Sequence, residues 1–170
     1  MKGVKKRSSI KRGEPMPLER LKEYLNSQNV KYVSVSHYET YTAQETAQSA
    51  HISGKELAKT VIVKMDGKMA MAVLPASQKI DFGLLKATAG ARKIELAGEE
   101  EFLKMFPDCE VGAMPPFGNL YGMDVYVAEG LAEDEEISFN AGSHIELVRM
   151  SYKDFARLVR PRVVKLSSGL

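Results

Sequence analysis

The chain has 170 residues, 44% of them hydrophobic, so it can bury one core and is not composed like a disordered chain. Its apolar runs, such as residues 70–74, are too short to cross a bilayer, and no secretory signal follows the basic N-terminus. The single cysteine, Cys109, excludes an internal disulfide and predicts a reducing compartment, the cytoplasm.

The net charge of +2 is unevenly distributed along the chain. Residues 1–13 hold six of the 24 basic residues and no acid, which leaves 18 basic and 22 acidic residues in the remaining 157. The body of the protein is therefore not a basic nucleic-acid-binding domain by bulk charge. RNA binding would have to use local patches and the N-terminal arm, which otherwise serves as a solubilising tail.

The first half of the chain carries four predicted elements. A helix begins at Pro17, because three leucines recur on one face at helical spacing. Alternation over residues 31–36 predicts a strand, and Thr42 is a suitable N-cap for a helix over residues 43–50. The strongest signal is a β-hairpin over residues 58–74, because Asp66-Gly67 is a favoured turn pair between two apolar runs.

The second half alternates short helices and short strands. A helix is predicted over residues 81–89 with Gly90 as its stop, and another over residues 99–106 with three acids in its first turn. Ser151 caps a last helix, which Pro161 ends. Four further strands are predicted, over residues 93–96, 124–127, 137–140 and 145–150.

This order of elements predicts a single mixed α/β domain. We expect one curled, mixed but mostly antiparallel sheet flanked by helices, because the regular strand–helix alternation of a doubly wound fold is missing. The expected boundaries are a flexible basic arm over residues 1–15, the domain over residues 16–166 and a C-terminal tail over residues 167–170.

Lys59 is the first candidate for chemistry, since it enters an otherwise apolar strand. A lysine there is costly to bury unless it has a partner. The alternative is a strand-end lysine whose ammonium reaches water while its aliphatic part packs on the sheet.

Two glycine-containing loops are the other candidates. In the segment Gly112–Gly118, two prolines fix the backbone and glycine lets a ligand approach backbone N–H groups. In the segment Asn140–His144, the amide and the imidazole flank a turn of small residues, and Gly142 could present an N–H to an oxyanion. The alternatives are a rigid connector and a hairpin turn with a polar cap.

Several common catalytic signals are missing from the sequence. It has no nucleophile elbow, no phosphate-binding glycine loop and no pair of histidines or cysteines at metal-ligand spacing. The candidate segments therefore favour positioning of an attacking water and stabilisation of an oxyanion, a machinery suited to a labile ester.

At these residues the chain resembles the YbaK family of prolyl-tRNA-synthetase-associated editing domains. The resemblance covers roughly residues 18–165. Its markers occur in family order, and the stretch from Met150 to Phe155 is similar to the family's last helix. The other markers are Tyr41-Thr42-Ala43-Gln44-Glu45, Lys59-Thr60, the Gly112–Gly118 loop and Phe139-Asn140-Ala141-Gly142-Ser143-His144.

The resemblance implies hydrolysis, in trans, of the ester between a wrong amino acid and its tRNA, assisted by the neighbouring ribose hydroxyl. It implies that Lys59 holds a terminal phosphate and that the two loops face the ester and the aminoacyl group. The residues with implied catalytic roles are Lys59, Gly112, Gly142 and His144. Those implied to bind substrate are Tyr41, Thr42, Met114, Pro115, Phe117, Gly118, Asn140 and Ser143.

The implied partners are mischarged aminoacyl-tRNA and prolyl-tRNA synthetase, with no metal, cofactor, membrane or DNA. Alanine on tRNA for proline is the first expectation, because the pairing of Asn140 with His144 resembles the alanine-clearing branch; cysteine, serine and threonine remain open. Two alternatives also remain open. One is a non-catalytic module that binds tRNA or a synthetase, and the other is a hydrolase of small acyl esters.

Overall fold

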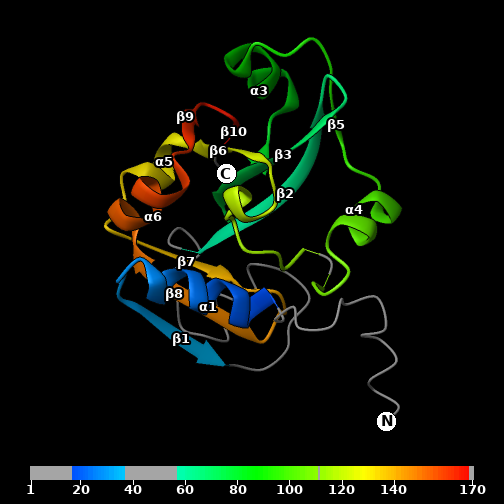
Figure 1. Cartoon of the computed structure of the whole chain (residues 1–170). Coiled ribbons are helices and arrows are strands. Elements are labelled where there is room, and N and C mark those ends of the chain that lie inside the picture. Colours follow the sequence, from blue (N-terminus) through cyan, green and yellow to red (C-terminus); the bar gives the residue numbers. More distant parts are fainter. Residues whose placement is uncertain (1–16, 37–56, 111, 169–170) are drawn as a thin grey trace.

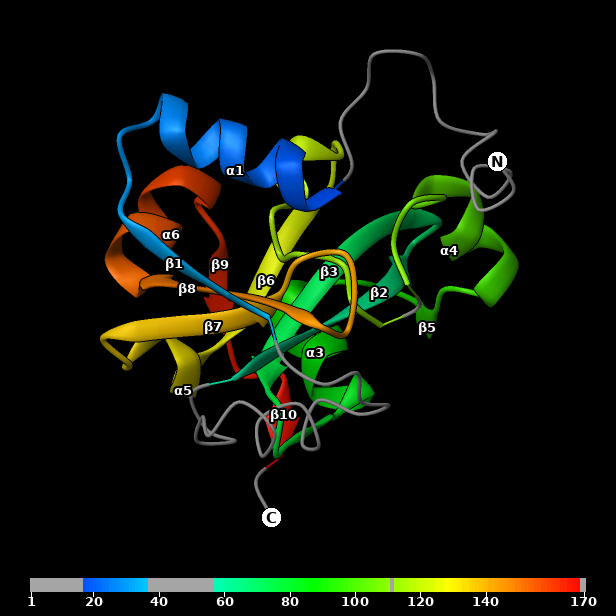
Figure 2. The same cartoon turned by 90° about the horizontal axis from the view of Figure 1, so that it is seen from below.

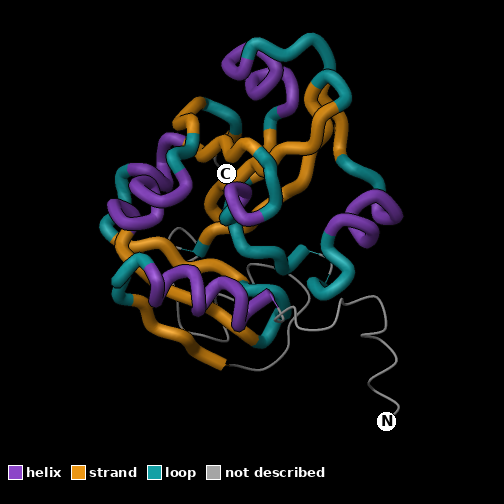
Figure 3. Tube along the Cα trace, viewed as in Figure 1, coloured by secondary structure: helices purple, strands orange, loops and turns teal. Residues whose placement is uncertain are grey.

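The computed structural model describes residues 17–36, 57–110 and 112–168. Strands run through the middle of the molecule and helices lie around them (Figures 1 and 3). The helices are α1 Pro17–Ser27, α3 Phe82–Ala89, α4 Glu99–Met105, the 3-10 turn η2 Gly118–Leu120, α5 Glu129–Ala132 and α6 Tyr152–Val159. No helix among these residues is long and apolar enough to cross a membrane.

Within the described ranges the strands form three sheets, whereas the sequence predicted one. A five-stranded sheet has the order β5-β2-β3-β6-β9, a three-stranded sheet has the order β1-β8-β7, and β10 pairs with β4. The strands are β1 Tyr32–Ser36, β2 Ala58–Met65, β3 Lys68–Pro75, β4 Lys79–Ile80, β5 Ile94–Leu96, β6 Asp124–Ala128, β7 Glu136–Asn140, β8 Glu146–Ser151, β9 Arg162–Val164 and β10 Ser167–Ser168.

The division into sheets follows from how β7 and β8 pair. β7 and β8 pair with each other, and β8 also pairs with β1, which makes the three-stranded sheet. The link from β7 to the five-stranded sheet is an isolated bridge between Ser138 and Leu57, just before β2. The mixed, mostly antiparallel character is confirmed, because among the strand pairs of the described residues only β3–β6 and β6–β9 are parallel. The expected C-terminal tail needs correction, since Ser167 and Ser168 form β10 against Ile80 and Lys79.

The local signals at turns and caps fold as predicted. Asp66 and Gly67 both have positive φ, +50° and +86°, as a tight hairpin turn requires. Asp81 caps α3 by accepting the Leu84 N–H at 2.9 Å, and Gly90 ends that helix in the left-handed region. The Ser151 hydroxyl caps α6 in the same way, at 3.0 Å from the Asp154 nitrogen.

Two apolar clusters pack on opposite faces of the five-stranded sheet. The larger cluster joins α1 and α6 to the Gly112–Gly118 loop, with Phe117 fully buried among aromatic rings. The smaller cluster packs Leu85 of α3 and Leu166 against the other face. Figure 2 shows α1 and α6 on one side of the strands and α3 with β10 on the other.

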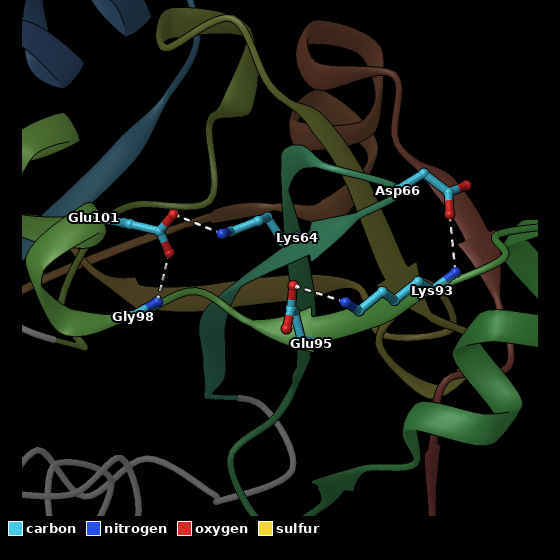
Figure 4. Close-up of polar contacts among 6 residues, drawn as sticks. All are labelled: Lys64, Asp66, Lys93, Glu95, Gly98 and Glu101. Carbon is cyan, nitrogen blue, oxygen red and sulfur yellow. Dashed lines mark hydrogen bonds and ion pairs between the residues drawn. The ribbon is translucent and has the colours of Figure 1, made fainter.

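Polar contacts attach the β5–α4 region to the central hairpin (Figure 4). The Lys64 ammonium of β2 lies 2.6 Å from a Glu101 carboxylate oxygen, and the other Glu101 oxygen accepts the Gly98 N–H at 3.0 Å. Asp66 accepts the Lys93 N–H at 2.9 Å. The hairpin turn is therefore bonded to the residue before β5, and α4 is paired with β2 of the hairpin.

Candidate active site

The structure brings together the two loops that the sequence singled out. The Glu110 N–H donates to the Gly142 carbonyl at 2.8 Å, and the Gly142 N–H donates to the Ala113 carbonyl at 2.7 Å. The His144 N–H donates to the Glu110 carboxylate at 2.7 Å. We call this paired segment, residues 110–113 with residues 140–146, the loop junction.

Two glycines in the loop junction require their conformation. Gly112 has φ +84° and Gly142 has φ +107°, which L side chains rarely adopt. A Cβ on Gly112 would lie 3.8 Å from Cε1 of His144, so the imidazole rests near the Gly112 backbone. A Cβ on Gly142 would lie 2.8 Å from Cβ of Pro17, so the start of α1 closes over Gly142.

The expected role of Gly142 as an oxyanion donor does not hold in this geometry. Its N–H is already used in the bond to Ala113, and its carbonyl is used by Glu110. Gly142 instead fixes the junction. Gly112 remains the better placed glycine, because it is exposed at the surface beside His144.

Asn140 and Ser143 also hold the turn together. Asn140 is buried, and its amide Nδ2 donates to the carbonyls of Ser143 and Glu146 at 3.4 and 3.5 Å. The Ser143 hydroxyl accepts the Ile145 N–H at 3.4 Å. These contacts support the position of His144 and do not by themselves direct the amide or the hydroxyl at a substrate.

The later part of the Gly112–Gly118 loop belongs to the core. Met114, Pro115, Phe117 and Gly118 are all buried, and Phe117 lies against the rings of Tyr24, Phe139 and Phe155 with centroids 5.4–6.2 Å apart. Burying the Phe117 ring in the core is more favourable than exposing it to water at the wall of a pocket. These side chains therefore hold the loop in place, and the expectation that the loop binds substrate stays a prediction.

Lys59 occupies the second position of β2, paired with Leu74 of β3. Its side chain is half-buried and lies on the strand face of Val61 and Val63, whereas Thr60 and Ile62 face the cluster of Phe117. Burial lowers the pKa of the Lys59 ammonium, and repulsion from Lys79 of β4 lowers it further. A second cation beside a partly desolvated one makes the position attractive to an anion.

A family model decides what kind of domain carries this arrangement. Residues 37–158, well over half of the chain, match the aminoacyl-tRNA editing domain. The chain belongs to this family. The resemblance predicted from the motifs is thereby confirmed, and the matched range includes Lys59 and both loops.

Two curated relatives extend the match. The chain is 26% identical to the multifunctional Ser/Thr-tRNA deacylase ProXp-y of Escherichia coli strain K12 over 152 residues, which are 86% of this chain and 90% of the relative. A proline–tRNA ligase of Bacillus mycoides is 28% identical over 75 residues, which are 44% of this chain but 13% of the ligase. The editing domain thus corresponds to a small part of that ligase.

Solved structures confirm the fold. A candidate trans-editing enzyme for prolyl-tRNA synthetase superposes with a TM-score of 0.77 and 21% identity, covering 92% of this chain and 100% of its own. A hypothetical protein superposes with a TM-score of 0.78 and 20% identity, covering 88% and 99%. At these identities the likeness establishes the editing-domain fold alone.

Two of the expected substrate-binding residues, Tyr41 and Thr42, lie outside the described residues, as does the helix expected after them. Among the residues that the structure does describe, no group of three or more His, Cys, Asp or Glu is placed to hold a metal ion. Cys109 is buried, and desolvation, aided by Asp108 and Glu110, raises the pKa of its thiol to about 12. It is therefore unsuited to act as a thiolate nucleophile.

Sequence reasoning missed Glu110 and Lys79. Glu110 lies two positions before the Gly112–Gly118 motif, and its carboxylate was not distinguishable from a solvated surface acid. Lys79 lies 20 positions after Lys59, and only the return of the chain from β3 into β4 brings the two cations near each other. Neither position carries a local pattern that would have marked it.

Proposed function

We propose that this protein hydrolyses the ester bond of mischarged aminoacyl-tRNA in trans. The observation that carries the proposal is the family match over residues 37–158, which spans every residue of the candidate site. The deacylase relative from Escherichia coli, matched over 86% of this chain, supports an ester hydrolase. The arrangement of the loops and Lys59 supplies the proposed roles.

In the proposed mechanism, Lys59 binds a phosphate at the 3′ end of the tRNA. Its ammonium is partly desolvated and has Lys79 as a cationic neighbour, so an arriving phosphate relieves the repulsion between the two. The attachment of Lys59 to a rigid strand fixes where that phosphate sits. This places the adjoining ribose, and with it the scissile ester, at a defined position.

The loop junction is proposed to act on the ester itself. Gly112 presents its exposed backbone to the developing oxyanion, while His144, positioned by Glu110 and Asn140, contacts the aminoacyl group or the attacking water. The ribose hydroxyl next to the ester assists the attack. These roles require no protein nucleophile, which agrees with the raised pKa of the buried Cys109 thiol.

The amino acid removed is proposed to be small. Alanine on tRNA for proline was the first expectation, while the relative's name points to serine and threonine. A pocket separates alanine from serine well only if it hydrogen-bonds the hydroxyl. The ligase match favours tRNA for proline, with prolyl-tRNA synthetase as the partner that makes the error, in the cytoplasm where tRNAs are charged.

A second candidate function is hydrolysis of small acyl esters without tRNA. It is favoured by the acidic body, since residues 14–148 contain 21 acidic and 12 basic residues. Salt dependence separates the two functions. Binding of tRNA through several phosphates weakens steeply as salt rises, whereas binding of a small ester does not.

The test is a panel of tRNAs for proline carrying alanine, cysteine, serine or threonine. We expect release of at least one amino acid, and a loss on the order of 10²-fold in kcat/KM for Lys59→Ala, because a fixed charge that positions the substrate is removed. Lys68→Ala, at the turn end of the same hairpin, is the matched control and keeps full activity.

Thermal unfolding accompanies the assay. A half-buried lysine near the start of a strand should contribute little to stability, so Lys59→Ala should unfold close to the wild-type temperature. Failure of the wild type to release any of the four amino acids would reject the proposed substrates and favour a binding module. A Lys59→Ala variant that is unfolded would show that this lysine is structural.

A further inference from the structure

Beyond the basic N-terminal arm, basic residues are concentrated toward the C-terminal end of the chain. Residues 149–168 contain six basic residues and one acid, whereas residues 14–148 contain 12 basic and 21 acidic residues. A polyanion that approached the acidic body would be repelled, and its approach over the C-terminal segment would be favoured. Residues 149–168 are therefore a basic segment that follows an acidic one.

The basic side chains follow the exposed face of α6. Lys153, Arg157 and Arg160 are exposed and lie one turn apart, while Tyr152, Phe155 and Val159 on the opposite face are buried. Arg160 caps the helix with φ +53°, which directs the chain into β9. Figures 1 and 2 both show α6 and β9 side by side.

The row of charges ends in a groove of about 470 Å³. Arg160 and Arg162 line it, together with Asn119, Gly122 and Asp124. The Arg162 guanidinium is held against Tyr126. It lies 5.1 Å from the centroid of the Tyr126 ring and donates a hydrogen bond to the Tyr126 hydroxyl at 3.2 Å. We call the set Lys153, Arg157, Arg160 and Arg162 the basic ridge.

The helix that carries most of the basic ridge packs against the loop of the candidate active site. The buried face of α6 packs on the loop through Phe155, whose ring lies 5.4 Å from that of Phe117. Asn119, which lines the groove, follows Gly118 directly in the chain. A molecule seated on the ridge is therefore held in a fixed relation to the loop.

We propose that the basic ridge binds the phosphodiester backbone of the tRNA, outside the 3′ end that enters the active site. This inference rests on the proposed function, which supplies a polyanionic substrate. Exposed arginines are suited to phosphate because the guanidinium can donate two parallel hydrogen bonds. The ridge gives an otherwise acidic domain the affinity that the 3′ end alone does not provide.

Acidic residues border the ridge and limit where phosphates sit. At the start of α6, the Tyr152 N–H donates to the Glu135 carbonyl at 2.8 Å and Ser151 pairs with Glu136, so two acids adjoin the Lys153 end. Asp154 lies 3.4 Å from Arg157, an exposed pair that tRNA can displace at little cost. Asp124 lines the groove together with Arg160 and Arg162, so a phosphate there would meet one carboxylate and two guanidinium groups. The ridge would thus contact a few phosphates and would not recognise base sequence.

The test measures binding of uncharged tRNA to the full chain as a function of salt. The variant Lys153→Gln, Arg157→Gln and Arg160→Asn removes three charges, and asparagine tolerates the left-handed backbone at position 160. We expect affinity to fall about tenfold or more at low salt and the log–log salt slope to flatten by about 2–3, because each phosphate contact contributes about 0.9.

A matched control removes three exposed lysines from the acidic body. Lys68→Gln, Lys86→Gln and Lys104→Gln make the same change in net charge and should leave affinity and slope near those of the wild type. Hydrolysis of the same amino acid on a CCA trinucleotide should be unaltered in both variants, because the proposal places the contacts of the ridge outside the 3′ end that this fragment represents.

Several results would overturn the assignment. These are an unaltered salt slope, an equal loss in the control, or a loss of trinucleotide hydrolysis in the ridge variant. Loss of affinity for prolyl-tRNA synthetase with tRNA binding intact would assign the ridge to a protein partner instead. Because uncharged tRNA is used, the binding result stands even if the wild type hydrolyses none of the mischarged tRNAs, so the two proposals fail separately.

Discussion

Gly118 has no room for a side chain. A Cβ there would lie 2.5 Å from the Met123 carbonyl oxygen and 2.6 Å from Cγ2 of Val125. One of these neighbours is backbone, so the clash cannot be relieved by turning a side chain. The residue lets the loop after Phe117 approach the start of β6 and so fixes how the candidate site is held.

We therefore expect Gly118→Ala to lower the free energy of unfolding by about 1–3 kcal/mol, the usual range for overpacking. Gly130→Ala in α5 is the matched control, because nothing lies within 4 Å of a Cβ there. Alanine in that helix should be neutral or stabilising by up to about 1 kcal/mol. Chemical denaturation of the three proteins checks this, and equal stabilities would refute the packing role.

Glu101 connects two elements, α4 and β2, and its ionisation makes that connection depend on pH. A hydrogen bond from Lys64 and one from the Gly98 N–H lower the pKa of Glu101 from its usual 4.5, and the same contact with Glu101 raises the pKa of Lys64. A lowered carboxyl pKa contributes stability above 4.5 that is lost as pH falls through the folded value.

The variant Glu101→Gln should accordingly be less stable than the wild type near neutral pH. The difference should shrink as pH falls below 4.5, since protonation removes the same charge from the wild type. Lys64 sets the other limit, because its contribution is lost as pH rises through its raised pKa. Glu99→Gln, in the same helical turn, is the control, and a pH-independent difference would contradict the pairing.

Elements specified by residues close together in the sequence could be predicted, whereas elements that depend on partners distant in the sequence could not. The hairpin turn at Asp66-Gly67 and the caps Asp81 and Ser151 are encoded within a few residues, and all three form. The short strands β4, β9 and β10 exist only because another strand lies beside them. Their two or three residues carry no periodicity that a sequence could show.

The same distinction between local and long-range features applies to the candidate site. Residue type was enough to select both glycine-containing loops as candidates, and the structure pairs them through Glu110, Ala113 and Gly142. That Phe117 turns into the core, or that the Gly142 N–H is already bonded, depends on how α1 and α6 pack over the loops. These are tertiary facts that composition and spacing do not contain.

At the scale of the whole molecule, basic residues are concentrated at the two ends of the chain. The N-terminal 13 residues carry six basic residues, the body over residues 14–148 is acidic, and residues 149–168 are basic again. An acidic body disfavours nonspecific adhesion to nucleic acid, so tRNA has to be engaged at the basic parts. The two ends of the chain would then supply affinity and the middle would supply chemistry.

Removing residues 2–13 should therefore weaken tRNA binding without slowing the bound enzyme. The deletion removes six positive charges, so the log–log salt slope should flatten, by up to about 5 if each charge meets a phosphate. Turnover at saturating substrate should stay the same, because Lys59 and the loop junction remain. A chain of equal length with the six basic residues replaced by glutamine should behave like the deletion, which separates charge from length. An unaltered salt slope in both would reduce the arm to a solubilising tail and leave the basic ridge as the main source of tRNA affinity.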